Sequence, residues 1–170
     1  MKTINLKFKK GFSFMEMIIY LTIFTTISIL VINSFIIILS SFSVINANHN
    51  LLESGSMAMD RISREIRQAQ NIDLTHSSFD SNSSFIRLNN VDRTSYIDFA
   101  KNNDELEMSK NGSLFDNLLA QNISLNKLVL RHIEMTNGEA VKIEMELGTI
   151  NSKVNKTANF YNTVILRGGY

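Results

Sequence analysis

One uncharged stretch near the N-terminus constrains this chain more than any other part of its sequence. No Asp, Glu, Lys or Arg occurs between Glu16 and Glu53, and the 23 residues of Met17–Leu39 inside this window are mostly apolar. As a helix they would extend about 34 Å, enough to cross a hydrocarbon core of about 30 Å. Because a backbone in lipid must bond to itself, the stretch predicts a transmembrane helix despite its many β-branched residues.

The basic residues predict how this helix is oriented. Four lysines lie within the first ten positions, and residues 40–60 contain no Lys or Arg. The positive-inside rule then predicts a single-pass protein of the cytoplasmic membrane, with the N-terminus inside and residues 46–170 outside. A secretory signal peptide is disfavoured, because its apolar core is shorter and Ile45–Ala47 is a poor cleavage site. An ordinary signal anchor fits the hydrophobicity and the charge equally well.

A plain anchor does not explain the order of residues ahead of the span. Lys9, Lys10 and Gly11 are followed by Phe12, and Glu16 then stands at the start of the apolar run. A carboxylate at the centre of a membrane helix costs about 2.5–3.5 kcal/mol even on permissive insertion scales. A residue with that cost is expected to have a partner or a task.

The segment KKGFSFMEMIIYLTIF resembles the cleavage and methylation motif of type IV prepilins. That motif places a basic leader, a Gly, a Phe and, one turn later, a Glu ahead of an apolar run, and the matching residues here are Gly11, Phe12 and Glu16. The resemblance implies that a prepilin peptidase cuts between Gly11 and Phe12 on the cytoplasmic side, after the leader lysines Lys9 and Lys10. It also implies that the new amine of Phe12 is methylated and that the apolar run packs against other pilins or pseudopilins.

Glu16 lies one helical turn after the amine that cleavage would create at Phe12. In a bundle of such helices the carboxylate can pair with its own amine or a neighbour's, and an unpaired carboxylate in apolar surroundings is costly. The resemblance therefore assigns Glu16 to setting the register of subunits as they leave the bilayer for a filament. Many family members have a proline at the position of Asn33, where the helix melts on assembly. This chain has no Pro, so a continuous helix is expected.

The helical pattern continues beyond the membrane span. The charged residues of DRISREIRQA fall opposite an apolar stripe, as expected for a solvated helix face rather than a nucleic-acid site. The stripe comprises Leu52, Met59, Ile62, Ile66 and Ala69. We expect one helix from Phe12 to about Gln70, with Gly55 as a candidate bend. Its outer half must pack against a partner, because a lone amphipathic helix in water is not stable.

From residue 73 onward apolar and polar residues alternate, which predicts strands. Ser113–Gln121 is expected to be a turn or a short helix, and Asn137-Gly138 between two alternating runs is a strong hairpin signal. The expected strands lie at 85–89, 96–99, 106–108, 128–133, 141–147 and 162–167. We therefore expect an α+β fold, in which the antiparallel sheet of a β-rich head packs on the outer half of the N-terminal helix.

These expectations divide the chain into four parts. They are a basic leader at 1–11, a transmembrane helix at 12–45, its amphipathic continuation at 46–72 and an extracytoplasmic head at 73–170. The segments RISREIRQAQNI, YIDFAKNNDELEMSKNG and LLAQNISLNKLVL resemble, more loosely, minor pseudopilins of the type II secretion J-component and pilus W-component kind.

No group of residues indicates catalysis or a cofactor. The chain has no Cys, and His49, His76 and His132 lack the spacing of metal ligands. Glu144 and Glu146 share a strand face, which is more typical of a solvated surface than of acid–base catalysis. Three aspartates in Asn/Ser-rich segments could bind calcium: Asp73, Asp80 and Asp92. They lack the spacing of a calcium-binding loop, so they indicate such a site only weakly.

The sequence therefore predicts a non-enzymatic minor pilin or pseudopilin subunit. Its expected partners are a prepilin peptidase, other pilins or pseudopilins and the lipid bilayer, and no cofactor or nucleic acid is expected. The filament machine stays open between a type IV pilus, a type II secretion pseudopilus and a competence pseudopilus. The alternative is a single-pass, membrane-anchored extracytoplasmic binding or sensor domain that does not assemble.

Overall fold

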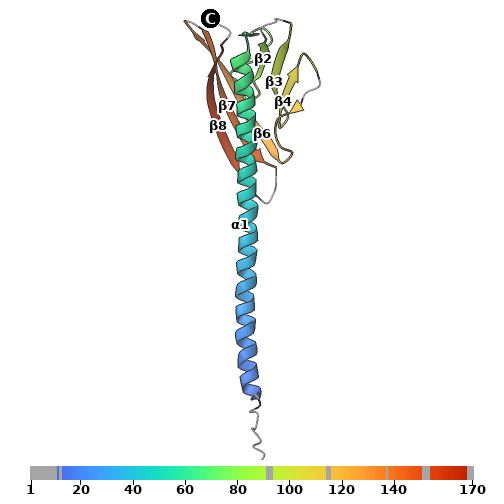
Figure 1. Cartoon of the computed structure of the whole chain (residues 1–170), viewed down its shortest axis with the longest axis vertical. Coiled ribbons are helices and arrows are strands. Elements are labelled where there is room, and N and C mark those ends of the chain that lie inside the picture. Colours follow the sequence, from blue (N-terminus) through green and yellow to red (C-terminus); the bar gives the residue numbers. More distant parts are fainter. Residues whose placement is uncertain are drawn as a thin grey trace, which may run out of the picture. The chain divides into compact units, whose positions relative to one another are not determined.

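The structure, a computed structural model, describes residue 11 and residues 13–90, 94–113, 116–136, 138–150 and 154–167. Lys9, Lys10 and Phe12 of the predicted cleavage motif lie outside the described residues. The chain divides into two compact units, residues 1–43 and residues 44–170. A long helix, α1, precedes all the strands (Figure 1). The elements are α1 (Phe14–Gln68), β1 (Asn71–Ile72), β2 (Phe85–Asn89), β3 (Tyr96–Asn102), β4 (Glu105–Lys110), β5 (Asp116–Asn117), β6 (Ile123–Met135), β7 (Gly138–Thr149) and β8 (Thr157–Ile165).

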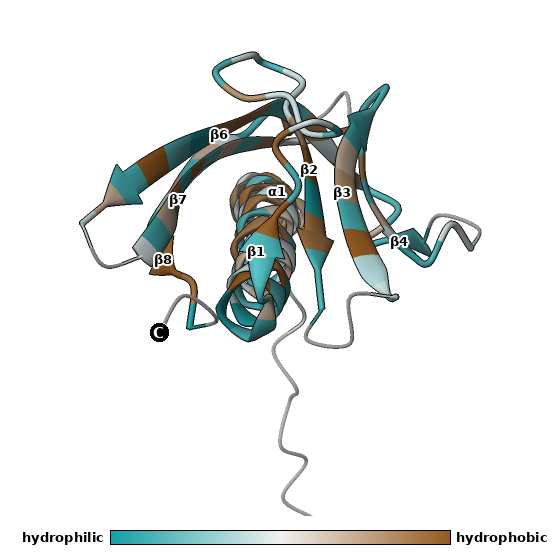
Figure 2. Ribbon diagram, turned by 90° about the horizontal axis from the view of Figure 1, so that it is seen from above, coloured by the Kyte–Doolittle hydropathy of each residue, from teal (hydrophilic) through white to brown (hydrophobic). Residues whose placement is uncertain are grey.

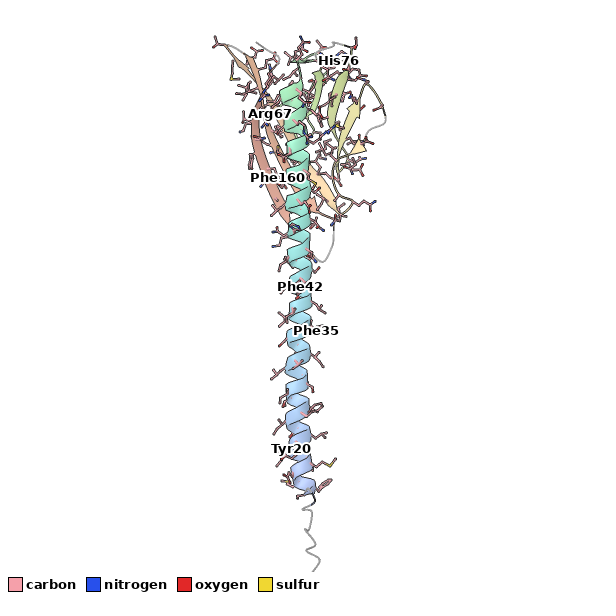
Figure 3. All side chains as sticks on the ribbon, viewed as in Figure 1. Tyr20, Phe35, Phe42, Arg67, His76 and Phe160 are labelled. Atoms are coloured by element: carbon pink, nitrogen blue, oxygen red, sulfur yellow. The ribbon has the colours of Figure 1, made fainter. Side chains whose placement is uncertain are left out.

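The first unit contains the apolar part of α1. In the described part of the chain, α1 is the one helix long and apolar enough to cross a membrane, and its apolar side chains are exposed. Phe35 and Phe42 project outward from it (Figure 3). Hydroxyl groups donate to carbonyls three or four residues earlier, as Ser34 does to Leu30 at 2.9 Å, which makes them compatible with apolar surroundings. The helix is continuous through Asn33, as expected for a chain without proline.

In the second unit α1 buries one face. The residues buried along it recur every three or four positions: Leu51, Ser54, Gly55, Ala58, Met59, Ile62, Ser63 and Ile66. The predicted stripe is confirmed with one correction, since Leu51 is fully buried and Leu52 is 45% exposed. The helix also ends earlier than the boundary at 72 implied. It ends at Gln68, because Asn71 and Ile72 pair with β2 as strand β1.

Gly55 has a packing role, and the prediction of a bend there was wrong. The helix continues through Gly55, and the ring of Phe160 on β8 occupies the space where a side chain would begin (Figure 3). A Cβ added to Gly55 would lie 2.1 Å from Cζ of Phe160, far inside van der Waals contact. Glycine therefore permits the close approach of β8 to the helix.

Two antiparallel sheets, rather than the single sheet expected, pack on this helix. One has the strand order β1-β2-β3-β4-β5 and the other β6-β7-β8. Figure 2 shows both curving around the helix. The segment that leads into β2 links them, because Ser83 forms an isolated parallel bridge with Leu128 of β6. The predicted α+β class, a long N-terminal helix packed against antiparallel sheet, is confirmed.

The two predicted hairpins are confirmed, and the link between them differs from the prediction. β3 pairs with β4 around Asn103, whose φ is 53°, and β6 pairs with β7 from Met135 opposite Gly138. Segment 113–121 was expected to be a turn or a short helix, but it contains the strand β5. The N–H of Leu118 donates to the carbonyl of Leu106, so this segment extends the sheet beside β4.

One hydrophobic cluster joins the helix to both sheets. Ile62 of α1, Phe99 of β3 and Leu128 of β6 are each fully buried in it. Alternation explains the strand contributions, since Ile86 and Leu88 of β2 face the cluster while the alternate residues Phe85, Arg87 and Asn89 face away from it. The apolar face of the amphipathic helix and the apolar faces of the two sheets thus bury each other.

Candidate functional site

The predicted cleavage motif can be placed only in part. Gly11 is exposed, precedes the helix, and has no other heavy atom within 4 Å of the position that a Cβ would take. Phe12, which would carry the new amine, and the leader residues Lys9 and Lys10 lie outside the described residues. Gly11 is therefore in an open position ahead of the helix.

Glu16 lies in the first turn of α1, where a carboxylate favourably faces the positive end of the helix dipole. The hydroxyl of Tyr20 donates a hydrogen bond to Oε1 of Glu16 over 3.2 Å (Tyr20 is labelled in Figure 3). The sequence reasoning missed Tyr20, although its spacing of four residues from Glu16 places both on one side of the helix. The pairing of Glu16 with an amine at Phe12 stays a prediction.

The most buried charged pair lies in the head, between β2 and β3. Arg87 donates from Nε and Nη2 to the two carboxylate oxygens of Asp98, each over 2.8 Å. The side chains are only 24% and 5% exposed, and the guanidinium carbon lies 4.2 Å from the ring centroid of Tyr96. The hydrogen bonds that Arg87 donates to Asp98 raise the pKa of the guanidinium. This pair has the geometry of a structural bridge, because both carboxylate oxygens are already occupied.

The three aspartates considered for calcium do not form a common site. The hydroxyl of Thr75, together with His76, holds the pKa of Asp73 down at about 2. Asp80 lies 3.4 Å from Arg131, and Asp92 is outside the described residues. In the part of the chain that the structure describes, no three His, Cys, Asp or Glu side chains gather into a possible metal site.

The two glutamates on the outer face of β7 each accept a side-chain hydrogen bond. Glu144 accepts a hydrogen bond from Lys142, which lowers the pKa of the carboxyl, and Nε of Arg131 lies 3.6 Å away. Glu146 accepts from the side-chain amide of Asn126. The side chain of Glu144 was expected to be solvated, but it is only 16% exposed. Held by cations, it is poorly suited to acting as a general acid.

The three histidines lie apart, each beside a carboxylate. His49 on the helix is 3.7 Å from Glu53, and His132 on β6 is 3.6 Å from Glu139. His76 follows β1 in a loop and is bonded to Asp73 (Figure 3). No pair of histidines is brought together for metal binding or proton transfer.

Comparison of the chain with protein-family models, curated proteins and solved structures finds no match. The functional argument therefore depends on the chain's own residues. Among these, Gly11, Glu16 and Tyr20 lie ahead of or at the start of the exposed apolar part of α1 and take no part in the hydrophobic cluster of the head.

Proposed function

We propose that this chain is the precursor of a minor pilin or pseudopilin, a non-catalytic subunit of a type IV pilus-like filament. The observation that carries the proposal is the spacing of Gly11, Phe12 and Glu16 directly ahead of the exposed apolar part of α1. A plain anchor needs only the apolar helix, and it does not explain why Gly11, Phe12 and Glu16 stand ahead of that helix in this order and spacing. The α+β head on the outer half of the same helix supports the proposal.

In this proposal, prepilin peptidase removes residues 1–11 at the cytoplasmic face and the amine of Phe12 is methylated. The helix holds the subunit in the cytoplasmic membrane, with the head outside, until it packs against the helices of other pilins. Glu16 then pairs with the amine at a chain start. Until that amine is in reach, the hydroxyl of Tyr20 satisfies part of the carboxylate's hydrogen-bonding capacity, which lowers the cost of apolar surroundings.

Processing is the direct test. Co-expression with a prepilin peptidase is expected to shorten the chain by residues 1–11 and to leave N-methylated Phe12, as read by intact mass and N-terminal fragment spectra. Gly11→Leu is expected to abolish cleavage, because a side chain at the cut position blocks the protease subsite. Ser13→Ala, two residues further on, is the matched control and is expected to be cleaved normally. A leader retained by the natural chain rules out the proposal.

Glu16→Val is expected to separate insertion from assembly. The variant should insert and be cleaved as the natural chain is, because an apolar residue only favours insertion. It should be lost from sheared filaments of the native host, because the amine of the neighbouring subunit has no partner. Glu53→Val, the same change at the other end of the uncharged window, should still be incorporated. Normal incorporation of Glu16→Val would remove this role from the carboxylate.

The second candidate is a membrane-anchored binding or sensor domain that does not assemble. It is favoured by the same apolar helix and by the compact head, neither of which requires a filament. The two candidates differ at Gly11, because an anchored domain keeps residues 1–11 whichever peptidase is present. The processing experiment therefore discriminates between them.

A further inference from the structure

The two sheets of the head differ in how their edges are protected. The five-stranded sheet ends in β1 and β5, which have two residues each. The outer edge of β6 is covered at its centre by segment 80–84, whose backbone bonds to the backbone of Leu128 and Leu130. Short or covered edges are common ways of preventing unwanted strand pairing. β8 is the exception, since it has nine residues and no described strand on its outer side.

The outer edge of β8 presents a row of backbone groups. Hydrogen bonds from Thr149 to Lys156 and from Leu166 to Glu139 frame the β7–β8 ladder, so even-numbered residues of β8 bond to β7. In an antiparallel ladder the alternate residues direct their N–H and C=O groups away from the partner. These are Thr157, Asn159, Tyr161, Thr163 and Ile165. One of these groups is occupied within the strand, because the N–H of Thr163 donates to Oδ1 of Asn162.

The sequence of β8 carries none of the usual defences of an edge strand. TANFYNTVI contains no charged residue and no Pro, and it pairs with β7 without a bulge. Charges, prolines and bulges are the devices that keep exposed edges from pairing. Tyr161 is 68% exposed and Ile165 is 52% exposed. An edge this long and neutral is suited to receive a further strand.

The helix beside β8 offers an apolar contact for that strand. Asn162 of β8 donates to Ser63 of α1, and Leu52 lies eleven residues, close to three turns, before Ser63. Leu52 is therefore on the β8 side of the helix, yet 45% of it is exposed. A strand added beside β8 would direct alternate side chains toward the helix and cover Leu52.

We propose that β8 is a docking edge for an extended segment of another protein, which adds a fourth strand to the β6-β7-β8 sheet. The outward N–H and C=O groups of β8 favour an extended partner segment. Leu52 favours an apolar side chain on the side of that segment that faces the helix. The neutrality of β8 means that charge does not select the partner.

A second copy is the less suitable occupant, an argument that rests on the proposed function. Phe160 contacts Gly55 and Asn162 contacts Ser63, so β8 and the helix run in the same sense. In an antiparallel pair of β8 strands, the two helices would run in opposite directions. Their N-terminal ends would then leave the pair at opposite ends and could not enter one membrane.

The test uses the full chain in detergent micelles and a probe peptide of alternating valine and threonine with a lysine at each end. Backbone hydrogen exchange at Asn159 and Tyr161 is expected to slow about tenfold or more when the peptide binds. The same peptide with a central proline should give no protection, a comparison that needs no variant of the protein. Protection by both peptides, or by neither, overturns the proposal.

Two variants at one position locate the contact. Tyr161→Pro removes an outward N–H that β7 does not use, a position where an edge strand tolerates proline, and should abolish protection at Asn159. Tyr161→Ala keeps the N–H and should retain protection. Equal protection in both variants overturns the proposal, and so does concentration-dependent protection without peptide, which would show that a second copy occupies the edge. None of these readouts depends on cleavage at Gly11, so failure here is distinguishable from failure of the proposed function.

Discussion

Asp98→Ala is expected to destabilise the head by about 3 kcal/mol. The change leaves the guanidinium of Arg87 without its carboxylate, although the Arg87 side chain is only 24% exposed. The two hydrogen bonds of 2.8 Å are lost together, and among the described residues no second carboxylate is bonded to Arg87. Breaking one partner of a buried pair is costly, because the desolvation of the remaining charge is no longer compensated.

The measurement is hydrogen exchange of the full chain in detergent micelles, read at the slowest amides of β3 and β7. These amides report the free energy of opening the whole head. Asp104→Ala is the matched control, since Asp104 is an exposed acid in the turn of the adjoining hairpin, and its effect should stay within about 0.5 kcal/mol. The double change Arg87→Leu with Asp98→Leu should recover most of the loss, because it leaves no unpaired charge. Equal effects of Asp98→Ala and Asp104→Ala would contradict the structural role of the pair.

Arg87 and Asp98 also illustrate what the sequence does and does not reveal. The alternation of Ile86 and Leu88 with polar residues predicts that Arg87 faces away from the core. It does not predict that Arg87 meets Asp98, because that depends on the register between β2 and β3. Nor does it predict that Asp98 is almost fully buried.

The elements themselves were largely predictable, because each has a local signal. The dipeptide Asn137-Gly138 is a local sequence signal for the β6–β7 hairpin, and period-2 alternation is the signal for the strands. The division into two sheets was not predictable, since it depends on which strands pair, and β5 and β6, although consecutive in the chain, belong to different sheets. At the candidate site, a local sequence motif identifies Gly11, Phe12 and Glu16. The hydrogen bond from Tyr20 to Glu16 was found only from the side-chain positions in the structure.

The start of the helix stripe shows how a tertiary contact corrects a periodic pattern. Leu51 and Leu52 are adjacent leucines, and either can begin a stripe that contains Met59 and Ile62. The sheets decide between them by packing on the side of the helix where Gly55 lies, which buries Leu51 and leaves Leu52 partly exposed. The glycine that selects this side looks, in the sequence alone, like a break in the helix.

Gly55→Leu is expected to destabilise the head by about 2–3 kcal/mol, the upper part of the range for overpacking a core. In an exposed helix the same change would stabilise by nearly 1 kcal/mol, because leucine is the better helix former. The sign is reversed here by Phe160, since a Cβ would lie 2.1, 2.4 and 2.7 Å from three atoms of its ring. Ser56→Leu, one residue further on at an exposed position, is the matched control and should be neutral or slightly stabilising.

A double-mutant cycle decides whether the ring is the cause. Gly55→Ala should destabilise alone because its Cβ meets the ring, and Phe160→Ala should destabilise alone because it empties the space beside the helix. Combined, they should cost less than the sum of the two, with a coupling of about 1–2 kcal/mol, because the added methyl group then occupies space that the ring has left. Hydrogen exchange at the slowest amides of β7 gives the free energy of opening the head for each of the three variants. Additive effects would mean that Gly55 is needed for the backbone of the helix rather than for its contact with β8.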